Sequence, residues 1–245
     1  MSQPSEPNSS NSTQENLQRS RKNPTLRKNL LILTLLAGCG TVFYALLFRL
    51  EMMAPPRLLP AVLCLTSCKP DQSIHSANTT SVEPEPRPIA DLLEESFEKE
   101  KISILVEKSA YQLTVFYDSE PIKTYPVVFG SAPTGDKLAE GDRKTPEGIY
   151  RIRDLYPHPE WSKFIWLDYP TPQDWQEHSQ AKLTGEISPT ATIGSEIGIH
   201  GVPEGADGLI DSRNNWTWGC VSLKNSDVDE IYDVVTQGTI IEIIP

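Results

Sequence analysis

An uncharged apolar run extends from Leu30 to Phe48, and it is either a membrane-spanning helix or a buried core helix, of which the second is disfavoured because nothing around it forms a partner layer. In an α-helix, this run of about nineteen residues extends roughly 28 Å, which is close to the thickness of a bilayer core. Basic residues cluster just before it, and such clusters stay on the cytoplasmic side: Arg19, Arg21, Lys22, Arg27 and Lys28. We therefore predict a transmembrane or signal-anchor segment at residues 30–48, with the rest of the chain beyond the membrane.

The regions on either side of this segment have compositions that are typical of segments without a packed core. Residues 1–29 are rich in Ser, Asn, Gln and Pro, so we predict a disordered cytoplasmic tail. Residues 49–100 hold a second apolar stretch and a polar, Pro-rich linker that would space a domain from a surface. A short acidic helix is expected at residues 90–101. Residues 101–245 form the predicted folded domain.

Two short segments resemble the bacterial lipobox, after which lipoproteins are cleaved and acylated on Cys. They end at Cys39 and at Cys68. Cleavage at Cys39 would leave an apolar segment in the mature chain, whereas cleavage at Cys68 would leave a polar tether. The second possibility fits best if translation starts at Met52 or Met53. A helical anchor and a lipid anchor both remain open, and each places the folded domain outside the cytoplasm.

Charge and cysteine content exclude some classes of function. The formal net charge is -11, which argues against nucleic acid as a partner, because phosphate binding requires an excess of Lys and Arg. Three of the four cysteines lie in or beside the N-terminal apolar segments, and only Cys220 lies in the folded part. That part cannot form an internal disulfide and has no paired Cys-x-x-Cys zinc motif. Cys220 is therefore either a buried residue without a chemical role or a reactive thiol.

The folded part has the pattern of consecutive short strands. Ile102, Ile104 and Val106 alternate with polar residues, and further apolar runs are separated by turns at residues 117–121 and 144–148. These runs are 112–117, 125–130, 149–152, 197–200, 219–223 and 239–244. A helix is expected at residues 227–236, with N-cap residues at 225–227 and Gly238 after its end. We predict a mainly β domain, a sandwich or small barrel with a short helix near the C-terminus.

Two residues of this domain could form a nucleophile and its base. Cys220 opens a predicted strand after Gly219, and His200 ends another strand before Gly201. A cysteine nucleophile needs a base beside it and donors that face the developing oxyanion, and a neighbouring Gly leaves room for backbone N–H groups to act as those donors. Taken alone, His200 could equally be a half-buried structural histidine. The other histidines lie in the linker or in polar stretches: His75, His158 and His178.

The ordered set of motifs resembles the catalytic domain of the L,D-transpeptidase family, which is also called YkuD-like. The resemblance covers residues 101–244 and rests on Ile199-His200-Gly201 followed by residues 216–225, Trp-Thr-Trp-Gly-Cys-Val-Ser-Leu-Lys-Asn. Upstream segments that are similar to the family lie at residues 111–113, 128–130, 135–137 and 141–148. The family therefore implies a YkuD-like sandwich or barrel.

The resemblance also implies roles for individual residues. Cys220 would be the nucleophile, His200 would take its proton, and the Gly201 carbonyl would orient the imidazole. Backbone N–H groups around Trp218, Gly219 and Cys220 would form the oxyanion hole. The family attacks the L-centre carbonyl of diaminopimelate in a peptidoglycan stem peptide, expels D-Ala, and passes the acyl group to an amine or to water. No metal or organic cofactor is implied.

Two positions depart from the usual family pattern. Trp218 stands where the family has His, and Ser222 stands where it commonly has Arg, a cation suited to a substrate carboxylate. With residues 168–174, these departures resemble the subgroup of murein-lipoprotein-releasing amidases. Transfer and hydrolysis therefore both remain open, with a wall-anchored lipoprotein as an alternative partner and a non-catalytic wall-binding domain as a third possibility. A papain-like peptidase is disfavoured, because its Cys precedes its His.

Several further residues are candidates for contact with substrate. We predict such contacts for Tyr169, Trp216 and Ser222. Arg143 is interpreted as a surface turn residue, and Asn225 is interpreted as a helix cap. The expected setting is the bacterial envelope, with the domain in the periplasm or otherwise outside the cytoplasmic membrane.

Overall fold

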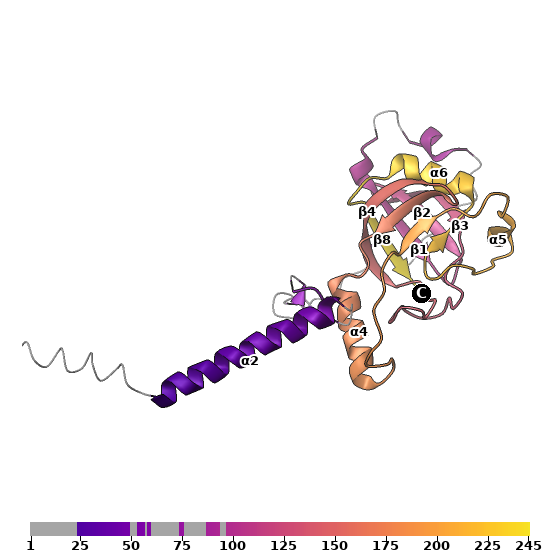
Figure 1. Cartoon of the computed structure of the whole chain (residues 1–245). Coiled ribbons are helices and arrows are strands. Elements are labelled where there is room, and N and C mark those ends of the chain that lie inside the picture. Colours follow the sequence, from indigo (N-terminus) through magenta and orange to yellow (C-terminus); the bar gives the residue numbers. More distant parts are fainter. Residues whose placement is uncertain (1–23, 50–52, 57, 60–73, 76–86, 94–96) are drawn as a thin grey trace, which may run out of the picture. The chain divides into compact units, whose positions relative to one another are not determined.

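The computed structural model describes residues 24–49, 53–56, 58–59, 74–75, 87–93 and 97–245. Residues 1–23 of the predicted tail at 1–29, most of the predicted linker and the possible acylation site at Cys68 lie outside these residues. The prediction of a disordered tail was wrong for residues 24–29, which belong to a helix that begins at Pro24. The chain forms two units, Met1–Arg49 and Leu50–Pro245 (Figure 1).

The first unit contains the helix α2, which spans Pro24–Arg49 and includes the predicted apolar segment. Its part from Leu31 to Arg49 is long and apolar enough to cross a membrane, and none of its side chains is buried. Cys39 is exposed on this helix with a free thiol.

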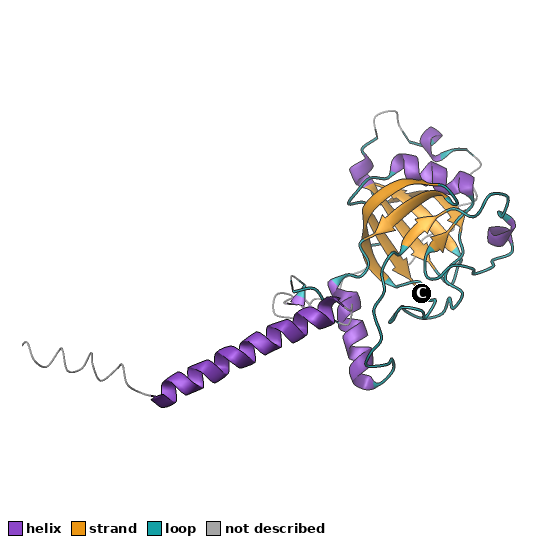
Figure 2. Ribbon diagram, in the orientation of Figure 1, coloured by secondary structure: helices purple, strands orange, loops and turns teal. Residues whose placement is uncertain are grey.

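The second unit is built on one curled, mixed sheet of eight strands (Figure 2). Their order in the sheet is β3-β2-β1-β8-β4-β5-β6-β7. The β1–β8 and β6–β7 pairs are parallel, and the other pairs are antiparallel. The strands are β1 (Ile102–Glu107), β2 (Gln112–Tyr117), β3 (Glu120–Pro126), β4 (Gly148–His158), β5 (Ser162–Leu167), β6 (Gly198–His200), β7 (Val221–Ser222) and β8 (Ile240–Ile244).

The sequence pattern accounts for the first strands of this sheet. Ile102, Ile104 and Val106 are buried in β1, and Asp118 and Ser119 both have positive φ, as a tight hairpin between β2 and β3 requires. The helix α6 (Asn225–Val234) buries its apolar stripe and contacts β5. That stripe consists of Val228, Ile231 and Val234. The prediction of a mainly β domain with a short C-terminal helix is confirmed.

Some local predictions were wrong. In the described part of residues 90–101, which excludes 94–96, two 3-10 turns stand in place of the expected helix: η1 (Ile89–Asp91) and η2 (Lys99–Lys101). A second helix of substantial length, α4 (Pro172–Thr184), was not expected; it begins with a capping box between Thr171 and Asp174. The helix α5 (Gly208–Asp211) is a single turn. Asn225 does not cap α6, because the N-cap is Lys224 and Asn225 Oδ1 accepts a hydrogen bond from Val202 N.

Candidate active site

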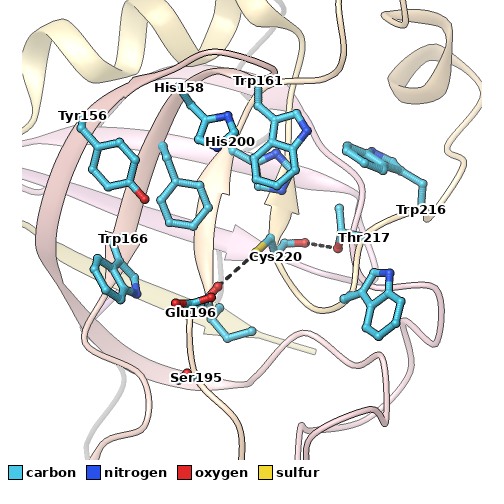
Figure 3. A pocket seen from close by; sticks show the side chains of 13 residues that line it. Tyr156, His158, Trp161, Trp166, Ser195, Glu196, His200, Trp216, Thr217 and Cys220 are labelled. Carbon is cyan, nitrogen blue, oxygen red and sulfur yellow. Dashed lines mark hydrogen bonds between the residues drawn. The ribbon is translucent and has the colours of Figure 1, made fainter.

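The parallel pair β6–β7 brings the two central candidates together. Its register pairs Ile199 with Val221 and His200 with Ser222. Cys220 immediately precedes β7 and is two residues from Ser222, so its side chain is directed to the same face of the sheet as that of His200. Both side chains line one cavity of about 540 Å³ (Figure 3).

His200 is held in one orientation and one tautomer. Its Nδ1 lies 2.7 Å from the carbonyl oxygen of Gly201. A carbonyl can only accept, so Nδ1 carries the proton and Nε2 of the neutral ring is left as an acceptor. The ring stacks against Trp161 with centroids 4.4 Å apart and against Phe164 with centroids 5.9 Å apart. This burial, with 2% of the residue exposed, lowers the pKa of His200 to about 4.

The Cys220 thiol lies beside the backbone of the segment that precedes β6. Its Sγ donates to the carbonyl oxygen of Glu196 at 3.6 Å. Burial raises the pKa of the Cys220 thiol to about 11, although a hydrogen bond from the Gly198 backbone opposes this rise. Cys220 and His200 are therefore both uncharged at neutral pH, rather than a preformed thiolate–imidazolium pair.

Glu196 has an unusual backbone conformation. Its φ is 60°, which places a residue with a side chain in the left-handed region. Such a conformation costs roughly 1–2 kcal/mol for a residue other than Gly. The carbonyl of Glu196 accepts the thiol hydrogen bond, and its side chain lines the cavity, so this conformation directs both groups toward Cys220.

The hydroxyl of Thr217 organises the loop before the nucleophile. It donates to the Cys220 carbonyl at 2.7 Å and accepts from Gly219 N at 3.2 Å. The Gly219 N–H is therefore already engaged. Within residues 97–245, the N–H groups of Trp218 and Cys220 meet no acceptor, which leaves these two as the donors available to an oxyanion.

A neighbouring loop packs closely behind Gly219. A Cβ added to Gly219, whose φ is 140°, would lie 2.7 Å from the Lys144 carbonyl oxygen, and a Cβ on Gly130 would overlap the carbonyl of Arg143. Asp142 holds this loop in place, since its carboxylate accepts hydrogen bonds from the backbone N–H groups of Leu138, Ala139 and Lys144 and pairs with Lys137 at 2.8 Å. The close contacts between the two loops at Gly130 and Gly219 fix the backbone around the Cys220 thiol.

The cavity is walled by aromatic rings (Figure 3). The indole N–H groups of Trp166 and Trp216 are buried and have no acceptor among the described residues. Trp218 is 73% exposed at the cavity, and the Arg143 guanidinium lies 5.0 Å from its ring centroid. The lining residues are Tyr156, His158, Trp161, Phe164, Trp166, Ser195, Glu196, Ile197, His200, Trp216, Thr217, Trp218 and Cys220.

Two predicted substrate contacts are corrected by burial. Tyr169 is 2% exposed and its hydroxyl donates to the Ile193 carbonyl at 3.1 Å, so it belongs to the core. Ser222 is fully buried and its Oγ donates to the Gly201 carbonyl at 3.2 Å, so it supports the backbone beside His200. Trp216 and Trp218 do line the cavity.

The sequence interpretation missed other residues of the cavity. His158 was set aside for its polar, Pro-rich surroundings, yet it stacks on Trp161 with centroids 4.3 Å apart. The aromatic density of residues 156–166 was the available signal, because a strand that alternates rings lines one face with them. Among the described residues, no group of three or more His, Cys, Asp or Glu side chains could hold a metal ion.

Comparison with solved structures gives similarity over about three fifths of the chain. Bd1075 of Bdellovibrio bacteriovorus shares 25% identity, with 62% of this chain and 49% of that chain covered and a TM-score of 0.43. The helical cell shape determining protein Pgp2 of Campylobacter jejuni shares 22% identity, with 63% of this chain and 53% of that chain covered and a TM-score of 0.42. An L,D-transpeptidase of Mycobacterium smegmatis shares 16%, covering 59% of each chain, with a TM-score of 0.39. The chain thus spans about half the length of the first two.

Comparison with families identifies the folded domain. No curated protein matches the chain. Residues 101–243, which are more than half of the chain, match the family model of the L,D-transpeptidase catalytic domain, YkuD. The chain therefore belongs to the L,D-transpeptidase catalytic-domain family.

Proposed function

We propose that the chain is a cysteine acyltransferase that forms a thioester between Cys220 and a peptidoglycan stem peptide. Membership of a peptidoglycan-modifying family supports the reaction type and the substrate class. The observation that carries the proposal is the β6–β7 register, which directs Cys220 and a His200 protonated on Nδ1 into one cavity. A thiol and an imidazole with a free Nε2 are the two groups that nucleophilic catalysis by cysteine requires, and here both line one cavity.

The first half-reaction would acylate the thiol. Sγ attacks the L-centre carbonyl of diaminopimelate while the thiol proton moves to His200 Nε2, and the N–H groups of Trp218 and Cys220 stabilise the oxyanion. The C–N bond then breaks, Nε2 returns its proton to the departing amine of D-Ala, and the acyl group remains on Cys220.

The second half-reaction would release the acyl group. An acceptor amine loses a proton to Nε2 and attacks the thioester, and Cys220 leaves as a thiolate that takes up that proton. Water in the place of the amine would give hydrolysis. We favour transfer, because residues 101–243 match the model of a transpeptidase catalytic domain.

We also propose that α2 anchors the domain in the cytoplasmic membrane. The apolar part of α2 has the length of a membrane span, and basic residues precede it. The domain would then act on the wall from the outer side of this membrane, in agreement with the envelope setting of the family. Acylation at Cys39 or Cys68 would be the lipid alternative, and the mass of the N-terminal peptide of membrane-extracted protein distinguishes the two.

Muropeptide turnover tests the proposed reaction. The detergent-solubilised full chain is incubated with tetrapeptide muropeptides, and products and intact protein are followed by mass spectrometry. We expect D-Ala release, cross-linked products and a transient acyl adduct on Cys220. Cys220→Ala should show none of these, whereas Cys39→Ala should behave as wild type.

The products also discriminate the alternatives. Tripeptides without any cross-link would replace transfer by hydrolysis. Identical products from wild type and Cys220→Ala would contradict the proposal, and tight muropeptide binding without any adduct would point to a wall-binding domain.

A further inference from the structure

The candidate cavity has one carboxylate and no Lys or Arg side chain in its lining. Glu196 is the one Asp, Glu, Lys or Arg among the lining residues, and burial lowers the pKa of His200. The remaining wall is largely aromatic. A carboxylate among aromatic faces favours a cationic group, through charge pairing and through the attraction of a cation to the ring faces.

The Glu196 carboxylate is available to a ligand. Its side chain is exposed in the cavity, and no hydrogen bond or ion pair engages it within the part of the chain that the structure describes. Arg153 stacks on Trp166 at 4.4 Å but forms no ion pair with Glu196. The negative charge of Glu196 acts on the Cys220 thiol, because it contributes to raising the pKa of Cys220. It also contributes to raising the pKa of Tyr156.

The cavity has two different sides around the thiol. In Figure 3, Glu196, Tyr156 and Trp166 lie on one side of Cys220, and Trp216 and Thr217 lie on the other. The first side is acidic. The second side belongs to the loop that carries the free N–H groups of Trp218 and Cys220, and Arg143 stacks on Trp218 there.

We propose that Glu196 determines donor specificity by holding an ammonium group on the side chain of the residue that becomes acylated. This inference rests on the proposed function. The expelled amino acid carries a carboxylate, which Glu196 would repel and Arg143 would attract, so the leaving group and the acceptor that follows it belong on the other side of Cys220. The acidic side is then left for the acyl residue itself. The donor class is thus a peptide whose acylated residue carries an ammonium group at the far end of an aliphatic side chain. In diaminopimelate this ammonium accompanies a carboxylate, so the side-chain end has no net charge, whereas the expelled amino acid presents a carboxylate alone.

A comparison of two donors tests this assignment. One stem peptide carries the free side-chain amine, and the other carries the same amine acetylated and therefore neutral. The rate constant for acylation of Cys220 is measured with the full chain in a single turnover, without acceptor, by intact mass. The ratio of the two rate constants is compared between variants, because a change in the thiol pKa affects both donors equally and cancels.

In wild type, we expect the acylation rate constant to be higher for the free-amine donor than for the acetylated donor by about tenfold or more. A ratio of this size is what the loss of one charge pair would produce. Glu196→Gln should reduce the preference to within about twofold, and Glu196→Asp should restore most of it. The matched control Glu186→Gln removes an exposed charge at the end of α4 and should keep the full preference.

Either of two outcomes would overturn the assignment. These are an undiminished preference in Glu196→Gln and an equal rate constant for both donors in wild type. Absence of Cys220-dependent acylation by either donor in wild type would instead overturn the proposed function.

Discussion

His200 and Ser222 share a single acceptor, the carbonyl oxygen of Gly201. His200 Nδ1 lies 2.7 Å from it and Ser222 Oγ lies 3.2 Å from it. The two donors reach the same oxygen because His200 and Ser222 are register partners in the β6–β7 pair. The strand that follows Cys220 therefore helps to fix the carbonyl that orients the proposed base.

Ser222→Ala removes the weaker of these two hydrogen bonds. We expect the free energy of unfolding to fall by about 1 kcal/mol, the usual net value of a hydrogen bond. The value of kcat/KM should fall only a few-fold, because His200 retains its acceptor. Denaturant unfolding and muropeptide turnover measure the two effects. A loss of activity above about a hundredfold at unchanged stability would mean that Ser222 contacts substrate.

Thr217→Val removes a hydroxyl that holds the backbone on both sides of Trp218 and Gly219. Val has nearly the same shape but cannot bond the Cys220 carbonyl or Gly219 N. We expect kcat to fall on the order of a hundredfold, as for the loss of an oxyanion donor, with little change in donor KM. Thr217→Ser should recover most of the activity. Wild-type kinetics in Thr217→Val would show that the hydroxyl does not position the loop.

The protonation of Cys220 predicts its reactivity toward iodoacetamide. Burial raises the pKa of this thiol to about 11 and lowers that of His200 to about 4, so the reactive thiolate is scarce at neutral pH. The rate constant should rise about tenfold per pH unit above pH 7 and level off near pH 11. Peptide-level mass spectrometry separates Cys220 from the other cysteines. A plateau reached already by pH 7 would indicate a preformed ion pair and contradict this expectation.

The buried imidazole also makes stability depend on pH. The pKa of His200 is about 4 in the folded chain, against about 6.5 unfolded, so between these values the unfolded chain binds a proton that the folded chain does not. The free energy of unfolding should therefore fall as pH falls from about 6.5 to about 4, by at most about 3 kcal/mol. Below pH 4 this contribution is exhausted.

His200→Gln isolates this effect from other groups. Burial raises the pKa of Asp174 to about 6, and this carboxyl acts in the opposite sense over much of the same range. Both chains contain Asp174, so the difference between wild type and His200→Gln reports the histidine. Chemical denaturation at several pH values measures it, and a difference that does not change with pH would contradict the burial of a neutral ring.

The central pair could be predicted from sequence because its signal is local. His200 ends a short apolar run before Gly201, Cys220 opens another after Gly219, and the order of the two motifs resembles a known family. The fold class followed from the alternation of Ile102, Ile104 and Val106 in β1 and from the short apolar run of β2, which is buried at four consecutive residues. Such signals lie within a few consecutive residues, so they can be recognised without knowledge of the tertiary structure.

The remaining features depend on contacts between distant residues. The helix α4 was missed because few of its residues are apolar, although Thr171 and Asp174 have the spacing of a capping box. The burial of Tyr169 and Ser222 depends on partners at Ile193 and Gly201. The position of Glu196 beside Cys220 depends on a positive φ and on a hydrogen bond from a thiol 24 residues away, and neither can be predicted from the periodicity of the sequence.

The position of β8 has a consequence for how the molecule matures. In the order of the sheet, β8 lies between β1 and β4 and is the last of the eight strands in the sequence. Apart from isolated bridges of Val128 with Ser222 and of Gly130 with Thr217, the half that bears His200 and Cys220 is joined to β1 to β3 through this strand, so the sheet is incomplete until residues 240–244 are in place. During synthesis or translocation across a membrane, the Cys220 thiol therefore belongs to a sheet that is not yet complete. The topology delays formation of the reactive site until the whole domain has been synthesised or translocated.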